Sequence, residues 1–451
     1  MNNYQVPKGT KDVFGEEITK WHKIEDLIKQ FTYVYNYTEI RTPIFEHTEV
    51  FKRGNDSSDM VNKEMYTFIP ANSSTSITLR PEGTAGVARS FVENKMYGNT
   101  DLPAKLYYVG PQFRHESPQK GRLRMFNQFG IECIGAKNPL LDVEAISLGY
   151  SFVAAIGLQD LKVLLNTLGD DESRANYREA LKEYFKDEIS NMCPDCQRRY
   201  IQNPLRILDC KVDAHKPIMN NVPKMSDYLN EESKAYFKQV CDGLDALDIP
   251  YEIDDRLVRG LDYYTHTVFE VVSENSAMGS QCTIFAGGRY DGLVEYFGGP
   301  ACSGIGWAMG IERLLLACEG EGIELAEEAN LDAYVLCLSK NANIHAFKVL
   351  NELRANGYRS ETDYLDRKFK AQFKSVERYK ATVAIMIGDK DIENGTVTIK
   401  RIADQKQFVI KFEELITTMD EIFGETDEHA HTCNCGNEGC TCGEHDHSTN
   451  E

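Results

Sequence analysis

The alternation of apolar and polar positions divides this chain of 451 residues into a long first part and a shorter second part. In the first part, apolar residues recur at helical spacing over residues 17–36 and 142–156. Two strand-like runs, residues 106–113 and 125–134, are joined by a long polar loop, which predicts an antiparallel hairpin with an extended loop. We therefore expect a first domain over residues 1–325, in which helices flank an antiparallel sheet.

Shorter patterns complete this first domain. Residues 64–79 predict two strands around a polar turn, and residues 304–319 predict a glycine-rich turn that enters a helix. Residues 170–240 have a mostly helical pattern and differ from the preceding chain in charge and cysteine content, so we expect an insertion there. The other expected elements are a helix at residues 85–94 and strands at residues 37–41, 161–166, 268–272 and 281–285.

The pattern changes after residues 319–330, which are rich in glutamate and glycine and predict a linker. Over residues 331–423, short apolar runs alternate with helical patterns, which indicates a small α/β domain with a mostly parallel sheet. The whole chain is therefore expected to have an α/β fold, with an α+β first domain. Residues 424–451 form an acidic tail without apolar periodicity, lysine or arginine, and we expect this tail to be disordered.

Charge and hydropathy restrict the class of protein. The formal net charge of −20 argues against a protein that coats nucleic acid indiscriminately, although a local basic path is not excluded. No apolar stretch reaches the roughly 20 residues that a membrane span needs. The first ten residues are polar and lack the apolar core of a secretion signal. We expect a cytoplasmic protein that has no membrane partner.

The 13 cysteines fall into isolated residues and clusters. The isolated ones, interpreted as reduced core residues, are Cys133, Cys241, Cys282, Cys302, Cys318 and Cys337. Cys193, Cys196 and Cys210 form a C-x-x-C pair with one further thiol, which is one ligand short of a four-ligand zinc site. His215 or Cys241 are the candidates for a fourth ligand, but reduced cysteines in an inserted segment are the favoured interpretation.

The tail carries the other cluster. Two C-x-C pairs are flanked by H-x-H pairs, a pattern that suits soft divalent or cuprous metals. The candidate ligands are Cys433, Cys435, Cys440, Cys442, His429, His431, His445 and His447. We expect this tail to bind a metal of unknown identity, and no step of the chemistry below needs it.

Two arginines stand at positions that suit phosphate binding. Arg114 follows the first strand of the hairpin, where a planar guanidinium offers a fork of donors to a phosphate. Lys120, Arg122 and Arg124 follow at short spacing and suit a polyanion. The glycine-rich segment 304–310 delivers Arg313 at the start of a helix, but its G-x-G spacing alone is weak evidence, and no flanking βαβ unit supports a dinucleotide site.

These segments resemble the three motifs of the class II aminoacyl-tRNA synthetases. Residues 39–43 and the helix before them resemble motif 1, residues 113–116 resemble motif 2, and residues 310–313 resemble motif 3. Residues 80–84, 257–264 and 286–293 are similar to signatures of the histidyl-tRNA synthetase family. The resemblance extends from about residue 8 to about residue 423. Ser117 departs from it, because the family often has arginine there, which puts one ATP or tRNA contact in doubt.

The resemblance implies an enzyme of protein biosynthesis, a histidine–tRNA ligase. It would use ATP with Mg²⁺ to activate L-histidine and would transfer it to tRNA(His). Motif 1 forms a subunit interface in this class, so a homodimer is implied. The second domain would bind the anticodon region, and a basic cluster at residues 367–374 fits that contact.

The resemblance also implies residue roles. Arg114 clamps the α-phosphate, and Arg259 bridges that phosphate and the histidine carboxylate, so these two are the expected catalytic residues. The residues expected to bind ATP are Arg114, Glu116, Arg122 and Arg313. The residues expected to bind histidine are Glu82, Gly83, Thr84, Arg114, Gln128, Glu132, Arg259, Tyr263 and Tyr264.

Within the histidine site, Glu82 and Thr84 are expected to hold the α-ammonium, and Glu132 and Tyr264 to read the two imidazole nitrogens. Only one of Tyr263 and Tyr264 is expected to face the site, since neighbouring strand residues face opposite ways. His115 and His266 are given structural roles, because the reacting carboxylate is already ionised and needs no base.

Two alternatives fall outside this enzyme class. One is a regulatory paralogue that has no charging activity and typically lacks the second domain and parts of the 257–264 signature; both are present here. The other is a metal-handling protein with a relic synthetase body, which the presence of Arg114, Arg259, Arg313, Glu82 and Glu132 disfavours.

Overall fold

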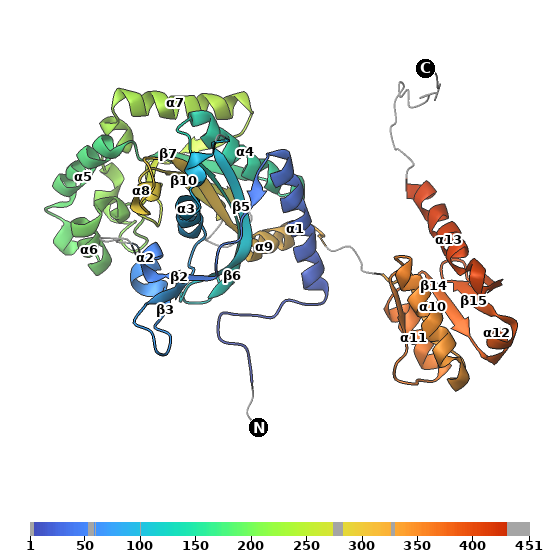
Figure 1. Cartoon of the computed structure of the whole chain (residues 1–451). Helices are drawn as coiled ribbons and strands as arrows, with labels where there is room; N and C mark the ends of the chain where they lie inside the picture. Colours follow the sequence, from blue (N-terminus) through green and yellow to red (C-terminus); the bar gives the residue numbers. More distant parts are fainter. Residues whose placement is uncertain are drawn as a thin grey trace, which may run out of the picture. The chain divides into compact units, whose positions relative to one another are not determined.

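The computed structural model describes residues 4–52, 58, 60–99, 101–273, 283–325 and 330–430. The chain forms two compact units, Met1–Glu327 and Glu328–Glu451, and each consists of a sheet with helices packed against it (Figure 1). The division falls within the segment that was expected to be a linker.

The first unit is built on an eight-stranded sheet with the order β1-β5-β6-β11-β10-β9-β7-β8. In that order, the strands are β1 (Thr38–Glu39), β5 (Ala104–Phe113), β6 (Met125–Ile134), β11 (Gly304–Gly310), β10 (Thr283–Tyr290), β9 (Tyr264–Ser273), β7 (Leu161–Thr167) and β8 (Tyr251–Ile253). Neighbours from β5 to β7 are antiparallel, and only the edge strands β1 and β8 pair in parallel. The expected antiparallel sheet and its β5–β6 hairpin are confirmed.

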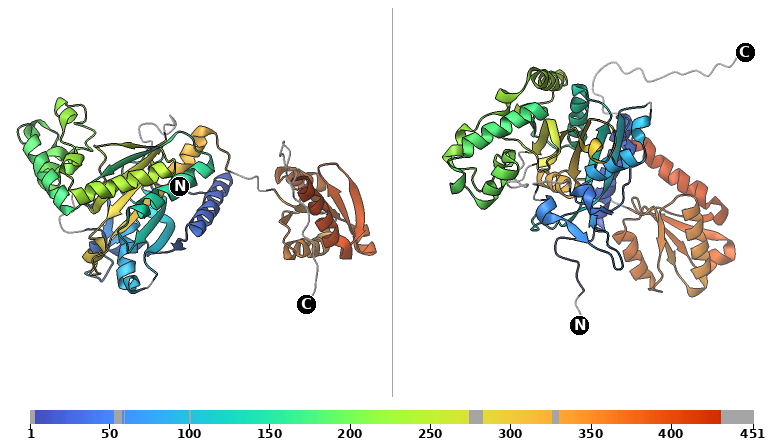
Figure 2. Two further views of the ribbon diagram at one scale, coloured as in Figure 1. Left: turned by 90° about the horizontal axis from the view of Figure 1, so that it is seen from above. Right: turned by 60° about the vertical axis from the view of Figure 1, so that its left-hand side comes forward.

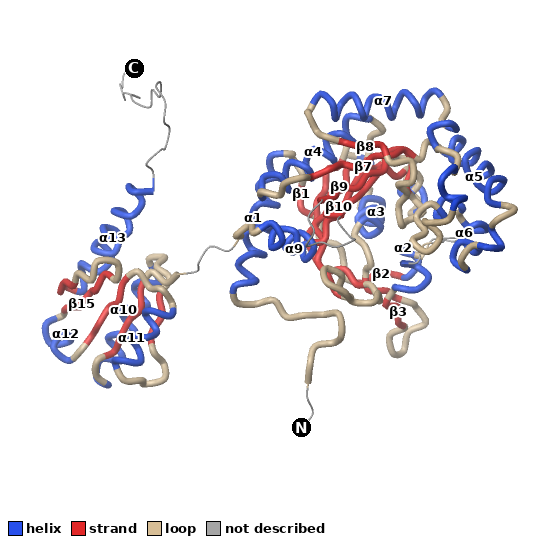
Figure 3. The backbone as a smooth tube through the Cα atoms, turned by 180° about the vertical axis from the view of Figure 1, so that it is seen from behind, coloured by secondary structure: helices blue, strands red, loops and turns tan. Residues whose placement is uncertain are grey.

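Helices α1 (Glu16–Val34), α4 (Pro139–Ile156), α7 (Glu231–Ala246) and α9 (Ile311–Glu321) supply side chains to the core on one face of this sheet. Phe129 of β6 and Trp307 of β11 lie at the centre of that core, with ring centroids 4.9 Å apart. Helix α4 is long and apolar enough to cross a membrane, but 56% of it is buried, as in a core helix. Helices α4 and α7 lie side by side (Figures 1 and 3).

The opposite face of the sheet packs on helix α3 (Thr84–Glu93) and the short helix α8 (Leu293–Tyr296). A small sheet with the order β2-β4-β3 lies before α3 in sequence and is formed by β2 (Phe45–His47), β4 (Ile77–Leu79) and β3 (Tyr66–Phe68). Helix α2 (Thr48–Phe51) follows β2. The two strands expected within residues 64–79 are therefore present.

The expected insertion has a core of its own. The insertion is formed by helices α5 (Asp171–Phe185) and α6 (Pro194–Gln202) and by short helical turns such as Pro204–Ile207 (Figure 2). Phe185, Cys196 and Met225 belong to its core. This core also includes Leu257, Val258 and Tyr264, which belong to the segment that leads into β9. The hydrophobic core of the insertion is thus continuous with the segment that leads into β9.

The second unit has a five-stranded sheet with the order β13-β12-β14-β15-β16. Its strands are β13 (Ser360–Thr362), β12 (Ala333–Cys337), β14 (Val383–Ile387), β15 (Thr396–Arg401) and β16 (Gln407–Lys411), and its helices are α10 (Asn343–Ala355), α11 (Phe369–Arg378), α12 (Asp389–Asn394) and α13 (Leu415–Ala430). Strand β12 pairs in parallel with β13 and β14, whereas β14–β15 and β15–β16 are antiparallel. The mostly parallel sheet was therefore a wrong prediction, because the connections after β14 are too short for crossovers.

Three further expectations need correction. Residues 304–310 form strand β11 and not a turn. The strand expected at residues 37–41 has only two residues, Thr38–Glu39. Helix α13 extends to Ala430 and so includes the first residues assigned to the tail, His429 among them. The tail beyond Ala430 lies outside the described residues, as do residues 281–282 of the strand expected at 281–285.

Candidate active site

A cavity of about 850 Å³ opens on the sheet face opposite the main core. Small residues on neighbouring strands form part of its lining: Ala286 of β10 lies opposite Ala308 of β11. The expected site residues that line it are Glu82, Gly83, Thr84, Arg114, Glu116, Arg122, Gln128, Arg259, Tyr263, Tyr264 and Arg313. Segments far apart in the sequence thus meet in one hollow, and of the expected site residues in this unit only Glu132 is not part of its lining.

The segment before α3 gives the cavity its acidic end. Glu82 is buried and accepts a hydrogen bond from the backbone N–H of Ala85 at 3.1 Å, so its carboxylate is fixed at the start of the helix. Gly83 is required sterically, because a Cβ atom there would lie 2.2 Å from the ring of Tyr108. The turn formed by Glu82, Gly83 and Thr84 therefore has no room for a side chain larger than that of glycine at position 83.

Arg114 is held where the β5–β6 hairpin leaves the sheet. Its Nε donates to the carbonyl of Pro81 at 2.8 Å, and its guanidinium lies 5.3 Å from the ring centroid of Phe126. Glu116 accepts from Nε of Arg122 at 2.9 Å and lies 4.0 Å from Nη1 of Arg114. These contacts orient Arg114 before any ligand binds.

Arg259 is held by a partner that the sequence pattern did not indicate. Its Nη1 forms an ion pair with Glu270 of β9, and its guanidinium lies 5.9 Å from the ring centroid of Tyr264. Burial lowers the pKa of Arg259, but the Glu270 carboxylate together with Tyr264 and Tyr263 raises it above its ordinary value. Glu270 also lines the cavity and accepts from the hydroxyl of Thr283 at 2.9 Å. Its only signal in the sequence is an acidic residue inside an apolar strand.

Glu132 lies beneath the cavity, behind Thr84. It is fully buried and accepts from the hydroxyl of Thr84 at 2.6 Å and from that of Tyr290 at 2.8 Å. Burial raises its pKa to about 8, although both hydroxyl donors act in the opposite direction. Glycine at position 306 is what admits the carboxyl group, since a Cβ there would lie 2.0 Å from its Oε2. Gln128 lies four residues earlier on β6 and does line the cavity.

Both tyrosines of the predicted pair line the cavity, with ring centroids 4.7 Å apart. The expectation that one of them would be only a core residue was wrong. Strand β9 begins at Tyr264, so Tyr263 lies in the preceding segment, where the alternation of strand faces does not apply.

Two family models match the chain: "Histidyl-tRNA synthetase" over residues 9–314 and "Anticodon binding domain" over residues 332–422. The chain belongs to the histidyl-tRNA synthetase family.

Among relatives of this family, the histidine–tRNA ligase of Bacillus cytotoxicus is 50% identical over 404 residues, which are 89% of this chain and 95% of that protein. The histidine–tRNA ligase of Staphylococcus aureus is 49% identical over 414 residues, 91% of this chain and 98% of that protein. The crystal structure of apo S. aureus histidyl-tRNA synthetase superposes with a TM-score of 0.80 at 44% identity, covering 92% of this chain and all of that one.

A Bacillus halodurans protein described as an ATP phosphoribosyltransferase regulatory subunit/histidyl-tRNA synthetase has a TM-score of 0.61 at 20% identity, covering 85% of this chain and 98% of that one. At that identity the likeness concerns the fold alone.

In this member of the histidyl-tRNA synthetase family, the insertion forms part of the cavity lining. Arg199, Arg206, Asp209 and Lys211 line it, and none of them was singled out from the sequence. Hydrogen bonds link the insertion to the segment that carries Arg259. Arg206 donates to the carbonyl of Gly260 at 2.6 Å, Arg174 donates to the carbonyl of Tyr264 at 2.6 Å, and Asn203 donates to Asp262 at 2.9 Å.

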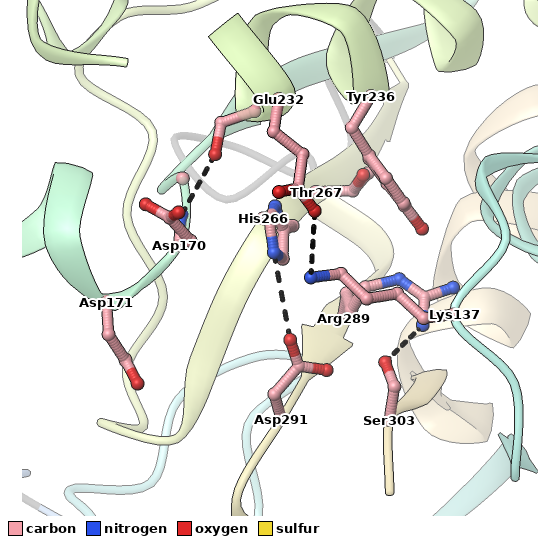
Figure 4. Close-up of polar contacts among 12 residues, drawn as sticks. Lys137, Asp170, Asp171, Glu232, Tyr236, His266, Thr267, Arg289, Asp291 and Ser303 are labelled. Carbon is pink, nitrogen blue, oxygen red and sulfur yellow. Dashed lines mark hydrogen bonds and ion pairs between the residues drawn. The ribbon is translucent and has the colours of Figure 1, made fainter. Parts of the chain in front are cut away.

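The histidines given structural roles, His115 and His266, are not among the cavity-lining residues. His266 is buried at the start of β9, and its Nε2 lies 3.7 Å from Asp291, toward which it points in Figure 4. Burial lowers its pKa, which favours the neutral ring. The ring of His115 packs edge-to-face on Tyr66, with centroids 5.4 Å apart.

Beside His266 lies a buried network centred on Arg289 (Figure 4). Arg289 and Asp142 are both fully buried and ion-paired, and the Nε of Arg289 donates to Asp142 at 2.9 Å. Asp142 also accepts from Thr267 at 2.6 Å and Tyr236 at 3.2 Å, while Arg289 donates to Ser303 at 2.5 Å. The network joins α4, α7, β9 and β10 behind the cavity.

The cysteines of the insertion also come together. They form a group of Cys193, Cys196, Cys210 and Asp213. Of these four residues, Asp213 was not singled out from the sequence. Neither His215 nor Cys241, the expected candidates for a fourth ligand, belongs to this group. The tail cysteines, and the tail histidines after His429, lie outside the described residues.

Proposed function

We propose that the protein is a histidine–tRNA ligase, which activates L-histidine with ATP, releases pyrophosphate and transfers the histidyl group to the 3′-terminal adenosine of tRNA(His). The observation that carries the proposal is the meeting of Arg114 and Arg259 with the acceptors Glu82 and Thr84 in one cavity. Family membership and the names of the relatives support the choice of amino acid.

Activation requires two anions, the histidine carboxylate and the ATP α-phosphate, to approach each other in line. We assign Arg114 to the α-phosphate and Arg259 to both anions, so that their charges offset the repulsion as the carboxylate oxygen attacks phosphorus and pyrophosphate leaves. Glu270 holds Arg259 until the substrates supply other anions. No general base is needed, because the attacking carboxylate is already ionised.

Histidine recognition is assigned to the other end of the cavity. Glu82 and Thr84 supply carboxylate and hydroxyl acceptors for the α-ammonium. Glu132 and Tyr264 pair with the two imidazole nitrogens, and Gln128 and Tyr263 complete the wall. Because Glu132 lies behind Thr84, its contact with the ring requires the Thr84 hydroxyl to rotate away from Oε1.

The ATP phosphates are assigned to the hairpin loop and to α9. Arg313 reaches the terminal phosphate, with Glu116 and Arg122 beside it. The donor set fits a Mg²⁺ ion held mainly by phosphate oxygens, because Glu116 and Glu312 line the cavity but Glu116 is paired with Arg122 and Glu312 accepts from the backbone of Asn127 at 3.0 Å. Bound there, Mg²⁺ would neutralise charge on the β- and γ-phosphates.

The second unit is assigned to the tRNA. Lys368, Lys370 and Lys374 at the start of α11 are exposed and suit contact with phosphates, whereas Arg367 is paired with Asp363. Tyr364 and Phe369 are exposed in the same segment and suit stacking on unpaired bases.

The proposal includes a homodimer in the cytoplasm. Large apolar side chains are exposed at the end of α1 and just after motif 1, where a class II subunit interface is expected: Tyr33, Val34, Ile44 and Phe45. Metal binding by the tail, through His429, His431 and the residues from Cys433 to His447, is a further part of the proposal and is separate from catalysis.

The test is ATP–pyrophosphate exchange with each of the twenty amino acids. We expect exchange that depends on histidine alone, and its loss in Arg259→Ala. The matched control is Arg256→Ala, because Arg256 lies in the same segment but is exposed and donates to the carbonyl of Met219. Exchange with another amino acid would contradict the assigned specificity, and the absence of any exchange would favour the regulatory alternative.

A further inference from the structure

The insertion contains a compact group of potential metal ligands. Cys193 and Cys196 lie at the N-terminus of α6, and Cys210 and Asp213 lie in the loop after Pro204–Ile207. One ligand atom from each of the four residues lies within 4.8 Å of the other three. Cys196, Cys210 and Asp213 are buried, and Cys193 is half-buried.

The spacing of these atoms matches a single tetrahedral ion. Zinc–sulfur bonds of about 2.3 Å place neighbouring sulfurs about 3.8 Å apart. The Sγ atoms of Cys193 and Cys210 are 3.7 Å apart, and Sγ of Cys210 is 3.8 Å from Oδ2 of Asp213. A cluster of several irons would need its ligands spread more widely.

We propose that Cys193, Cys196, Cys210 and Asp213 bind one zinc ion that fixes the insertion beside the active site. The set is three soft thiolates and one carboxylate, and zinc accepts both kinds of ligand in tetrahedral geometry. Binding releases the thiol protons to solvent, so the ion replaces three protons in the group.

Backbone N–H groups support three of the four ligand atoms. The N–H of Cys196 points at Sγ of Cys193, and the N–H of Asp213 points at Sγ of Cys210, both at 3.4 Å. The N–H of Cys193 donates to Oδ2 of Asp213 at 2.8 Å. Lys216 lies 2.9 Å from Oδ1 of Asp213, so its charge offsets part of the excess negative charge of the site. Such outer contacts orient ligands and tune their charge.

The location gives the ion a consequence for the cavity. Cys193 and Cys210 themselves line it, and the loop between Cys210 and the preceding helical turn carries Asp209. The same turn contains Arg206, which bonds to the carbonyl of Gly260, next to Arg259. An ion that joins α6 to this loop would therefore hold in place those residues of the insertion that line the cavity.

The competing interpretation is a redox pair, because two thiols 3.7 Å apart need only a small movement to form a disulfide. A second complication is the tail, which carries its own cysteines and histidines. The experiment must separate both from the proposed site.

The probe is Co²⁺, followed by Zn²⁺ competition, on the full-length chain in which the four tail cysteines are serine and the four tail histidines are alanine. We expect one Co²⁺ per chain with sulfur-to-cobalt charge-transfer absorption, displaced by one equivalent of Zn²⁺. Elemental analysis of the same chain purified without chelator should give one zinc.

Cys210→Ser and Asp213→Asn in this background should lose the bound metal, and Cys241→Ser is the matched control that should keep it. A second measurement does not depend on the folding of ligand variants. Removal of zinc by a chelator from the parent chain, which carries only the tail substitutions, should lower the Tm, and zinc alone should restore it. Two results would overturn the proposal: no stoichiometric metal in the parent chain, or a Cys193–Cys210 disulfide in metal-free protein isolated without reductant.

Discussion

The cavity has two walls that are held in place in different ways. The sheet wall is positioned by strand register, by small residues at paired positions, and by the buried Arg289–Asp142 network behind it. The insertion wall is positioned by the core that it shares with Leu257 and Val258, by single hydrogen bonds such as Arg206 to Gly260, and by the cysteine group. We therefore expect substitutions in the sheet wall to have larger effects on stability than substitutions at the exposed contacts of the insertion wall.

The largest difference between the walls should appear at two Arg–Asp pairs. Asp142→Ala leaves the fully buried Arg289 without its partner and should cost about 3–5 kcal/mol of unfolding free energy. Asp171→Ala removes the exposed partner of Arg174 in the insertion and should cost no more than about 1 kcal/mol. Denaturant titration of both variants tests this, and equal losses would contradict the contrast between the walls.

A smaller effect is expected from filling the sheet wall. Gly306→Ala would place a Cβ 2.0 Å from Oε2 of Glu132 and 2.4 Å from the carbonyl of Ile131, so we expect a loss of about 2–3 kcal/mol. Gly260→Ala is the control, since its Cβ would meet nothing within 4 Å. Thermal unfolding of the two variants should separate them; an unchanged Tm for Gly306→Ala would show that the strands can shift apart.

The raised pKa of Glu132 predicts a pH effect on stability. Its pKa is about 8 in the folded protein, against an ordinary value near 4.5. The folded state therefore holds the proton more tightly, and the resulting stabilisation is complete below about pH 4.5 and is lost as the pH rises through 8. Relative to Glu132→Gln, which stays neutral, the wild type should lose about 1 kcal/mol per pH unit between these limits. The measurement is the free energy of unfolding of both proteins as a function of pH. If the two proteins showed the same pH dependence, the carboxyl group of Glu132 would not be held neutral by burial.

The smallest expected effect concerns the insertion wall. Arg206→Met removes the hydrogen bond to Gly260, and we expect the KM for histidine to rise about tenfold, equivalent to about 1.4 kcal/mol, with kcat nearly unchanged. Lys182→Met, which removes an exposed ion pair with Glu179 in α5, is the control. A large fall in kcat for Arg206→Met would show that this wall also positions the reacting groups.

Local patterns predicted those parts of the site that depend on one segment. The hairpin that carries Arg114 follows from two apolar runs and a polar loop, and the common face of Gln128 and Glu132 follows from strand periodicity. The glycine run at residues 304–310 was misread, because glycine marks a turn as often as a close approach, and only the neighbouring strand shows that Gly306 makes room for Glu132.

The residues that the sequence did not reveal are those whose role comes from contacts between distant segments. Glu270 gains its role from Arg259 eleven positions earlier, and Asp213 gains its own from the fold of the insertion. The antiparallel end of the second sheet was missed for a related reason, since strand direction depends on how a connection returns to the sheet.

Trp307 gives the sheet wall an optical reporter. The chain has two tryptophans, and this one lies in β11, with its indole N–H donating to the carbonyl of Ala145 at 2.7 Å and its ring packed between Phe129 and Phe285. The other, Trp21, is on α1. A Trp21→Phe protein would therefore emit from Trp307 alone, and its spectrum would follow the wall of the cavity in real time as ligands enter and leave.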